Sequence, residues 1–216
     1  LKTSQVGASY LDREEILKKI KSIKNTCKSK NLPNVYLLHG EFTNEEMNQI
    51  YNHPKVKAMV CLTKGEGFGR PLLEFSLANK PIITTNWSGH IDYLNPEFTT
   101  LLPGQMTKVH PSAANDMLLQ EADWFSVDTG RVGFYLKDVF SNYKNYKEKA
   151  KRQGYYSRTN FSFEKMKEKI DSILQDKIPE FPKHVSLNLP KLKKIGKNSE
   201  NDTKKLKLPK LKKLEV

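Results

Sequence analysis

The segment Glu66–Glu74 constrains the fold of this chain more than any other stretch. It reads Glu-Gly-Phe-Gly-Arg-Pro-Leu-Leu-Glu and follows an apolar, strand-like run at residues 58–62. Gly67 and Gly69 predict a tight turn. Pro71 predicts a helix start, because a proline at the first helical position loses no hydrogen bond. A strand, a glycine turn and a helix in this order are typical of phosphate-binding α/β proteins.

Helix-like and strand-like patterns alternate through the first 176 residues, which predicts an α/β fold with a parallel sheet flanked by helices. The predicted strands are short apolar runs at residues 35–38, 58–62, 81–84 and 99–102. The predicted helices have apolar side chains at three- and four-residue spacing and cover residues 12–23, 43–51, 72–78, 132–150 and 162–174. Asp12, Thr43 and Asp128 are the expected helix caps.

The last forty residues differ in composition from the rest of the chain. From Lys177 to Val216 there are twelve lysines against four acidic residues, so this segment carries +8 of the total charge of +13. The sequence Leu-Pro-Lys-Leu-Lys-Lys occurs at residues 189–194 and again at 208–213. Dense lysine, proline and few large apolar side chains predict a disordered tail. We therefore expect a folded domain at residues 1–176 and a tail at 177–216.

The remaining composition points to a cytoplasmic protein. Two cysteines, Cys27 and Cys61, are too few for a disulfide framework, and a reducing compartment suits them. No apolar run approaches the roughly 20 residues that a membrane-spanning helix needs, and no signal-peptide pattern opens the chain. Because the chain begins at Leu1, within what looks like the end of a strand, we expect a domain cut out of a longer protein.

The two carboxylates of the central segment suit separate parts of a nucleotide-sugar diphosphate. Backbone N–H groups near Phe68, Gly69 and Arg70 would donate to the phosphates at the positive end of a helix dipole. Glu74 lies one turn further, roughly 6 Å along the helix axis, where its carboxylate would accept hydrogen bonds from ribose hydroxyls. Glu66, before the turn, would face the sugar. The alternative is that both glutamates are solvated surface acids and the glycines only form a loop.

These residues resemble a known family. Residues 66–74, followed by Asn-Lys-Pro-Ile-Ile-Thr-Thr-Asn-Trp-Ser-Gly at 79–89, are similar to the donor-binding half of retaining GT-B glycosyltransferases of the family-4 type, the glycosyl transferases group 1. The resemblance implies a Rossmann-like domain, over residues 1–176, that binds a nucleoside-diphosphate sugar. It puts Glu66 on the transferred sugar, Glu74 on the ribose and the backbone of Gly67–Gly69 on the phosphates.

The resemblance also implies further site residues. Family members carry a basic residue near the end of the first strand, against the diphosphate, so Lys2 is a candidate. A second basic residue, usual several positions later, has no equivalent between Gly7 and Leu11, and Arg70 is the candidate substitute. The loop His39–Phe42 is expected near the nucleotide base.

Three aromatic residues near these motifs have simpler explanations. His90 follows Ser88-Gly89, where the family commonly has two glycines, and a lone loop histidine is more often solvated than functional. Trp87 and Trp124 are expected to be packing residues.

The resemblance implies an enzyme that is incomplete here. GT-B enzymes hold the acceptor on a separate N-terminal domain, and nothing in these 216 residues supplies it. We therefore expect the chain to bind donor weakly and to transfer no sugar by itself. Transfer would proceed with retention of configuration, without a metal and without a cofactor beyond the donor.

Two other functions stay open from the sequence. The chain could be a non-catalytic module whose tail, around residues 189–213, contacts nucleic acid or an acidic membrane, although a solvated linker explains the same lysines. It could also be another GT-B protein, such as a sugar-nucleotide epimerase or a phosphorylase. An epimerase would need additional acid–base groups in the pocket, and none is evident. A phosphorylase would need a lysine that carries pyridoxal, and its sequence context is not evident either.

Overall fold

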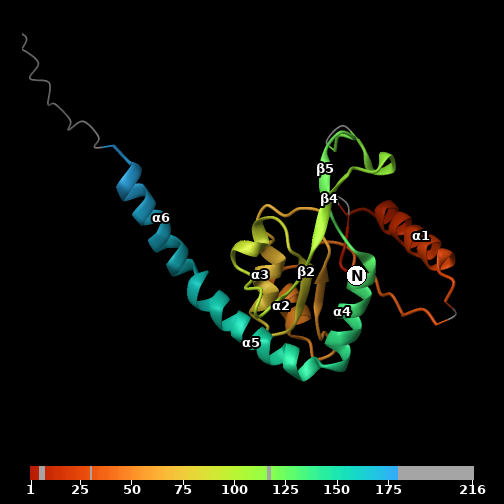
Figure 1. Cartoon of the computed structure of the whole chain (residues 1–216), viewed down its shortest axis with the longest axis horizontal. Coiled ribbons are helices and arrows are strands. Elements are labelled where there is room, and N and C mark those ends of the chain that lie inside the picture. The colour runs from red at the N-terminus through yellow and green to blue at the C-terminus, as the bar shows by residue number, and fades with distance from the viewer. Residues whose placement is uncertain (5–7, 30, 116–117, 180–216) are drawn as a thin grey trace, which may run out of the picture. The chain divides into compact units, whose positions relative to one another are not determined.

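The computed structural model of the protein describes residues 1–4, 8–29, 31–115 and 118–179 (Figure 1). One compact unit covers Leu1–Gln175, and a second begins at Asp176. The predicted disorder of the tail and its two lysine-rich repeats lie outside the described residues. None of the described helices has the length and apolar character needed to cross a membrane.

The centre of the compact unit is a parallel sheet of three strands, β1 (Met59–Cys61), β2 (Ile82–Thr85) and β3 (Thr100–Leu102), in the order β1-β2-β3. All three match predicted strands to within one residue at each end. The predicted strand at residues 35–38 is reduced to a single parallel bridge between Leu38 and Lys2. The α/β fold with a parallel sheet is therefore confirmed, with a smaller sheet than expected.

Helices cover both faces of this sheet, because successive side chains of a strand point to opposite faces. On one face, Ile82 packs with the apolar side chains of α2 (Asn44–Asn52) and α3 (Arg70–Ser76). On the other face, Ile83 packs with Val139 of α4 (Thr129–Ser141). Figure 1 shows α2 and α3 on one side of β2 and α4 on the other. Every residue of β2 is buried, as expected for a strand covered on both faces.

The predicted single helix at residues 132–150 is wrong, since two helices occupy this region. α4 ends at Ser141 and α5 (Tyr143–Asn160) begins two residues later, after Asn142 leaves the helical conformation with φ −111° and ψ 30°. The bend has a clear cause. α4 packs on the sheet face that holds Ile83, whereas α5 packs against α3, which covers the opposite face.

A β-hairpin that the sequence did not predict follows the sheet. Its strands, β4 (Gly104–Lys108) and β5 (Asp123–Val127), pair antiparallel. The ring of Phe125 stacks on Trp87 with centroids 5.7 Å apart and planes at 6°. Phe125 also donates its backbone N–H to the carbonyl of Lys64 at 3.3 Å. The hairpin is therefore joined to the loops that follow β1 and β2.

The helix caps agree with the sequence in two of three cases. Thr43 and Glu46 form both hydrogen bonds of a capping box at the start of α2, and Asp128 accepts from Gly130 at the start of α4. The prediction for Asp12 is wrong, because α1 (Tyr10–Thr26) begins earlier and Ser9 is its N-cap. The last helix, α6 (Phe163–Lys177), begins after Ser162 as predicted.

Candidate functional site

The glycine turn lies between β1 and α3, and its conformation requires glycine at position 69. Gly69 has φ 75° and ψ 45°, in the left-handed region that residues other than glycine rarely adopt. A Cβ there would also lie 3.0 Å from the Tyr93 hydroxyl and 3.2 Å from the Cβ of His90. Tyr93 donates its hydroxyl to the Gly69 carbonyl at 2.5 Å. α3 begins at Arg70, so Pro71 is its second residue and not its first as predicted.

Glu66 is held by its backbone and leaves its carboxylate unpaired. Its N–H donates to the Ser88 hydroxyl at 2.9 Å, and its carbonyl accepts from the Gly89 N–H at 2.9 Å. The carboxylate of Glu66 has no hydrogen bond or ion pair with any described residue, although the residue is half-buried. The loop after β2 thus fixes where Glu66 sits without using its charge.

Gly67 differs from its neighbours because the fold makes no demand for a glycine there. A Cβ added to Gly67 would meet nothing within 4 Å, and its φ lies outside the positive region. The backbone N–H groups of Gly67, Phe68, Gly69 and Arg70 have no acceptor among the described residues. The turn therefore has unpaired donors within the described structure, and the space beside Gly67 is open.

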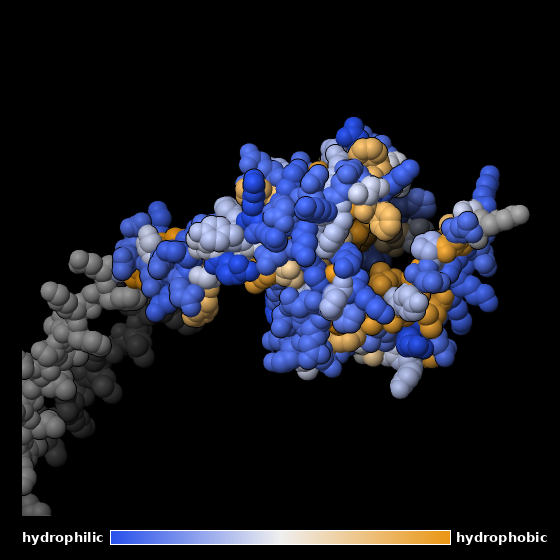
Figure 2. All heavy atoms as spheres, turned by 90° about the horizontal axis from the view of Figure 1, so that it is seen from below, coloured by the Kyte–Doolittle hydropathy of each residue, from blue (hydrophilic) through white to orange (hydrophobic). Residues whose placement is uncertain are grey.

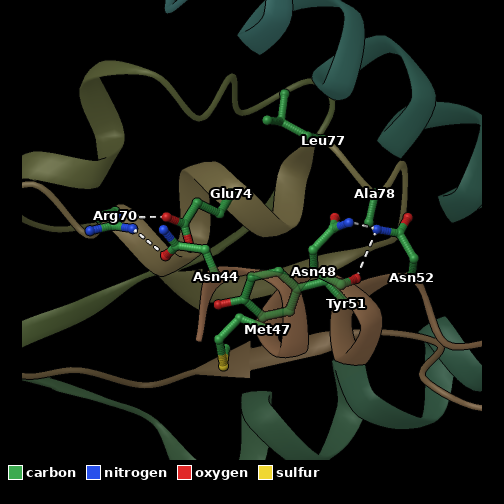
Figure 3. Close-up of a pocket in the computed structure, with 9 residues that line it drawn as sticks. All are labelled: Asn44, Met47, Asn48, Tyr51, Asn52, Arg70, Glu74, Leu77 and Ala78. Carbon is green, nitrogen blue, oxygen red and sulfur yellow. Dashed lines mark hydrogen bonds and ion pairs between the residues drawn. The ribbon is translucent and has the colours of Figure 1, made fainter. Parts of the chain in front are cut away.

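A pocket of about 340 Å³ lies between α2 and α3 (Figure 3). Its lining comprises Asn44, Met47, Asn48, Tyr51, Asn52, Arg70, Glu74, Leu77 and Ala78. The Arg70 Nε donates to Glu74 Oε1 at 2.5 Å, and Arg70 Nη2 donates to Asn44 Oδ1 at 3.2 Å. Both contacts appear as dashed lines in Figure 3. One polar wall of the pocket is therefore a connected set of a carboxylate, a guanidinium and an amide.

The ionisable groups of this pocket influence one another. The hydrogen bond to Glu74 raises the pKa of the Arg70 guanidinium, which stays charged. Burial raises the pKa of the Tyr51 phenol, and the nearby Glu74 carboxylate raises it further. Tyr51 is therefore a neutral hydroxyl at physiological pH, while Arg70 and Glu74 form an ion pair.

The structure brings some of the predicted site residues together and leaves others apart. Arg70 and Glu74 line the pocket, and the turn of Gly67–Gly69 leads directly into it. Phe68 packs on Tyr93 with ring centroids 5.0 Å apart. Glu66 is not part of the pocket lining, and it lies at the other end of the turn.

Lys2 has contacts away from the pocket. Its backbone forms the bridge with Leu38, and its ammonium group lies 5.4 Å from the centre of the Phe42 ring. Lys2 does not line the pocket that holds Glu74. Its predicted contact with a diphosphate stays a prediction.

The expectation that His90 is solvated is wrong. His90 is completely buried, and its Nε2–H donates to the Thr85 carbonyl at 2.7 Å. Its Nδ1 has no partner in the part of the chain that the structure describes. The physical reason is the 3-10 turn Gly89–Asp92, which folds the histidine back under the glycine turn, where its Cβ approaches Gly69.

Sequence reasoning also missed the contact between Asp12 and His39. The two side chains are largely buried, and His39 Nε2 lies 2.7 Å from Asp12 Oδ2. The pair joins the first turn of α1 to the loop that was expected near the base. The sequence does not indicate this pair, because an aspartate near the start of a helix is ordinarily interpreted as a helix cap.

Comparisons with known proteins leave the family open. No family model matches the sequence, and no curated protein matches it at a significant level.

Among the described residues no group of three or more histidine, cysteine, aspartate or glutamate side chains is placed to hold a metal ion.

Proposed function

We propose that residues 1–176 form the Rossmann-like donor domain of a retaining GT-B glycosyltransferase of the family-4 type, and that the domain binds a nucleoside-diphosphate sugar. The observation that carries this proposal is Gly67. A glycine costs a folded chain conformational entropy unless its backbone needs the freedom or a neighbour needs the space. Neither applies to Gly67 within the described structure. A ligand that lies against the backbone at this position supplies the missing reason.

The diphosphate is assigned to the unpaired N–H groups of the glycine turn. Four successive residues, 67–70, offer donors without a protein acceptor among the described residues. Arg70 is the last of these four residues. Its guanidinium uses two of its five N–H groups on Glu74 and Asn44. Its remaining donors would be available to an anion bound at the turn. Backbone donors and one cation would together neutralise the charge that develops on the leaving diphosphate.

The two glutamates take the two ends of the donor. Glu74 faces the pocket between α2 and α3, where its carboxylate would accept hydrogen bonds from the ribose. Glu66, whose carboxylate is unpaired within the described structure, would accept hydrogen bonds from the transferred sugar. In the transfer step the bond between the anomeric carbon and the diphosphate breaks. The acceptor oxygen bonds on the same face, and its proton passes to the leaving diphosphate.

The test is calorimetric titration of the chain with a panel of nucleoside-diphosphate sugars, using a pair of matched glycine variants. A Cβ at Gly67 or at Gly133 meets nothing within 4 Å, and neither residue has positive φ. Gly67→Ala and Gly133→Ala should therefore both fold with undiminished thermal stability. Only Gly67→Ala should weaken donor binding, by about tenfold or more, because its methyl group occupies the space of the diphosphate.

A second pair of variants tests the ribose contact. Glu74→Ala should weaken the binding of every donor, whereas Glu45→Ala, an exposed change on α2, should not. Binding of no donor by the unmodified chain, or equal affinities for unmodified chain and Gly67→Ala, would refute the proposal. The alternative of an anionic surface bound through residues 189–213 concerns a segment outside the described structure.

A further inference from the structure

α6 has an apolar stripe that no described residue covers. Every residue of the helix is exposed, and five large apolar side chains recur at helical spacing. They are Phe163, Met166, Ile170, Ile173 and Leu174, with exposed fractions between 38% and 81%. In Figure 2, hydrophobic atoms show among hydrophilic ones along the segment next to the grey atoms.

Such a helix needs a partner to be stable. Isolated helices of about 15 residues are marginal in water, because most helical stability in proteins comes from packing of the apolar face. α6 has 15 residues, none of them buried. The stripe also differs from scattered surface apolar groups, since its members lie on one face over about three turns.

The charges of α6 are arranged in a way that favours a lipid surface as this partner. The helix has four lysines and four acidic residues. At about 100° per residue, Lys167, Lys169 and Lys177 project within roughly a quarter turn of the centre of the stripe, and all four acids project further away. Lysines beside an apolar face can bury their methylene stems and extend their ammonium groups to headgroups.

The sequence beyond α6 adds a second contribution of the same sign. Residues 178–216 carry eleven lysines against four acids. Clusters of lysine next to an amphipathic helix attract anionic lipids, with each lysine near the surface contributing about 1 kcal/mol. A nucleic acid would complement these lysines equally well, but it offers no apolar medium for the stripe on α6.

We infer that α6 lies in the surface of an anionic lipid bilayer, with its apolar stripe at the boundary of the acyl chains and the following lysines on the headgroups. This surface is separate from the proposed donor site and does not depend on it. It assigns to the protein a peripheral attachment to a membrane.

The experiment is flotation of the full chain with two kinds of vesicle, phosphatidylcholine alone and phosphatidylcholine mixed with phosphatidylglycerol. The unmodified chain should bind the mixed vesicles and lose that binding in high salt. The double variant Ile170→Ser/Ile173→Ser should bind them at least about tenfold less, because two apolar side chains no longer enter the interface. The matched control is Leu17→Ser/Ile23→Ser on α1, which also removes two exposed apolar side chains and should bind normally.

Three outcomes would overturn the inference. The first is equal binding of mixed vesicles by the unmodified chain and the α6 variant, which would assign attachment to the lysines alone. The second is binding of a labelled oligonucleotide, measured by fluorescence anisotropy, without binding of either vesicle. The third is concentration-dependent self-association of the chain that the α6 variant abolishes, again without vesicle binding.

Discussion

Gly89 lies in direct contact with the backbone of Gly67: a Cβ added to Gly89 would be 1.9 Å from the Gly67 carbonyl oxygen. The two residues belong to loops that follow adjacent parallel strands, β1 and β2, so both loops meet at the carboxyl end of the sheet. The bonds between Glu66 and Ser88 complete the contact. The candidate site is therefore formed by two loops that fix each other.

Replacing Gly89 with alanine should damage both the fold and the site. The new methyl group cannot fit against Gly67, so the loops must move apart, and overpacking of this kind costs about 1–3 kcal/mol. Urea denaturation would measure the loss in the free energy of unfolding. Gly133→Ala is the control, because it adds a methyl group in open space on α4 and should stabilise the chain slightly. Equal stability of the two variants would contradict the contact.

Replacing Tyr93 with phenylalanine should loosen the glycine turn. The Tyr93 hydroxyl is buried and donates to the Gly69 carbonyl, and burial raises the pKa of this phenol well above its ordinary value. Loss of this hydrogen bond should lower the free energy of unfolding by about 1 kcal/mol. Tyr155→Phe, at a position that is 70% exposed, should change it little. Thermal unfolding of the two variants side by side would check this, and a Tyr93→Phe protein as stable as Tyr155→Phe would refute it.

Replacing Tyr146 with phenylalanine should produce a loss of stability that depends on pH. The Tyr146 hydroxyl donates to the Asp138 carboxylate across the joint between α4 and α5, and this bond lowers the pKa of Asp138. A lowered folded-state pKa means that the contact stabilises the protein above the ordinary pKa of aspartate, about 3.9. The contribution disappears as the pH falls through the lower, folded-state pKa.

Thermal unfolding at several pH values measures this effect. Tyr146→Phe should melt below the unmodified chain at pH 7, and the gap should close at acid pH. Asp138→Asn should lose most of the same pH dependence. A gap of constant size down to the acid range would show that the carboxylate makes no contribution.

The sequence predicts the parallel sheet well because its strands are short apolar runs bounded by clear breaks. The runs at 58–62, 81–84 and 99–102 each match a strand of the sheet to within one residue at either end. The hairpin β4–β5 escapes prediction for the opposite reason. Only Phe125 among its ten strand residues is buried, so the alternation of polar and apolar residues that marks a half-buried strand is weak.

Helix boundaries depend on tertiary contacts that periodicity does not contain. The apolar repeat continues from Val139 through Tyr143 to Ala150, and it predicts one helix across Asn142. The structure bends the chain there because α4 and α5 pack on different layers. The buried side chain of Gln153 on α5 forms hydrogen bonds with the backbone of Tyr93 and Asn95. No local sequence pattern predicts these contacts.

The candidate site was predictable where its residues are neighbours in sequence. The turn at residues 67–69, and the helix after it that carries Glu74, follow from the spacing of the glycines and the proline. The buried His90 and the pair of Asp12 with His39 were not predictable, because each depends on segments far apart in the chain meeting in space. For a histidine in a loop, the sequence does not indicate whether a later turn will bury the side chain.

The bend at Asn142, between α4 and α5, should not tolerate an inserted residue. Gly154 lies so close to Asn79 that a Cβ there would be 2.1 Å from the Asn79 side-chain oxygen. One extra residue after Asn142 would rotate α5 by about 100° and carry Gly154 away from this contact. Added residues between β4 and β5, by contrast, leave α5 in phase, so lineages that vary in length would be expected to do so in that hairpin.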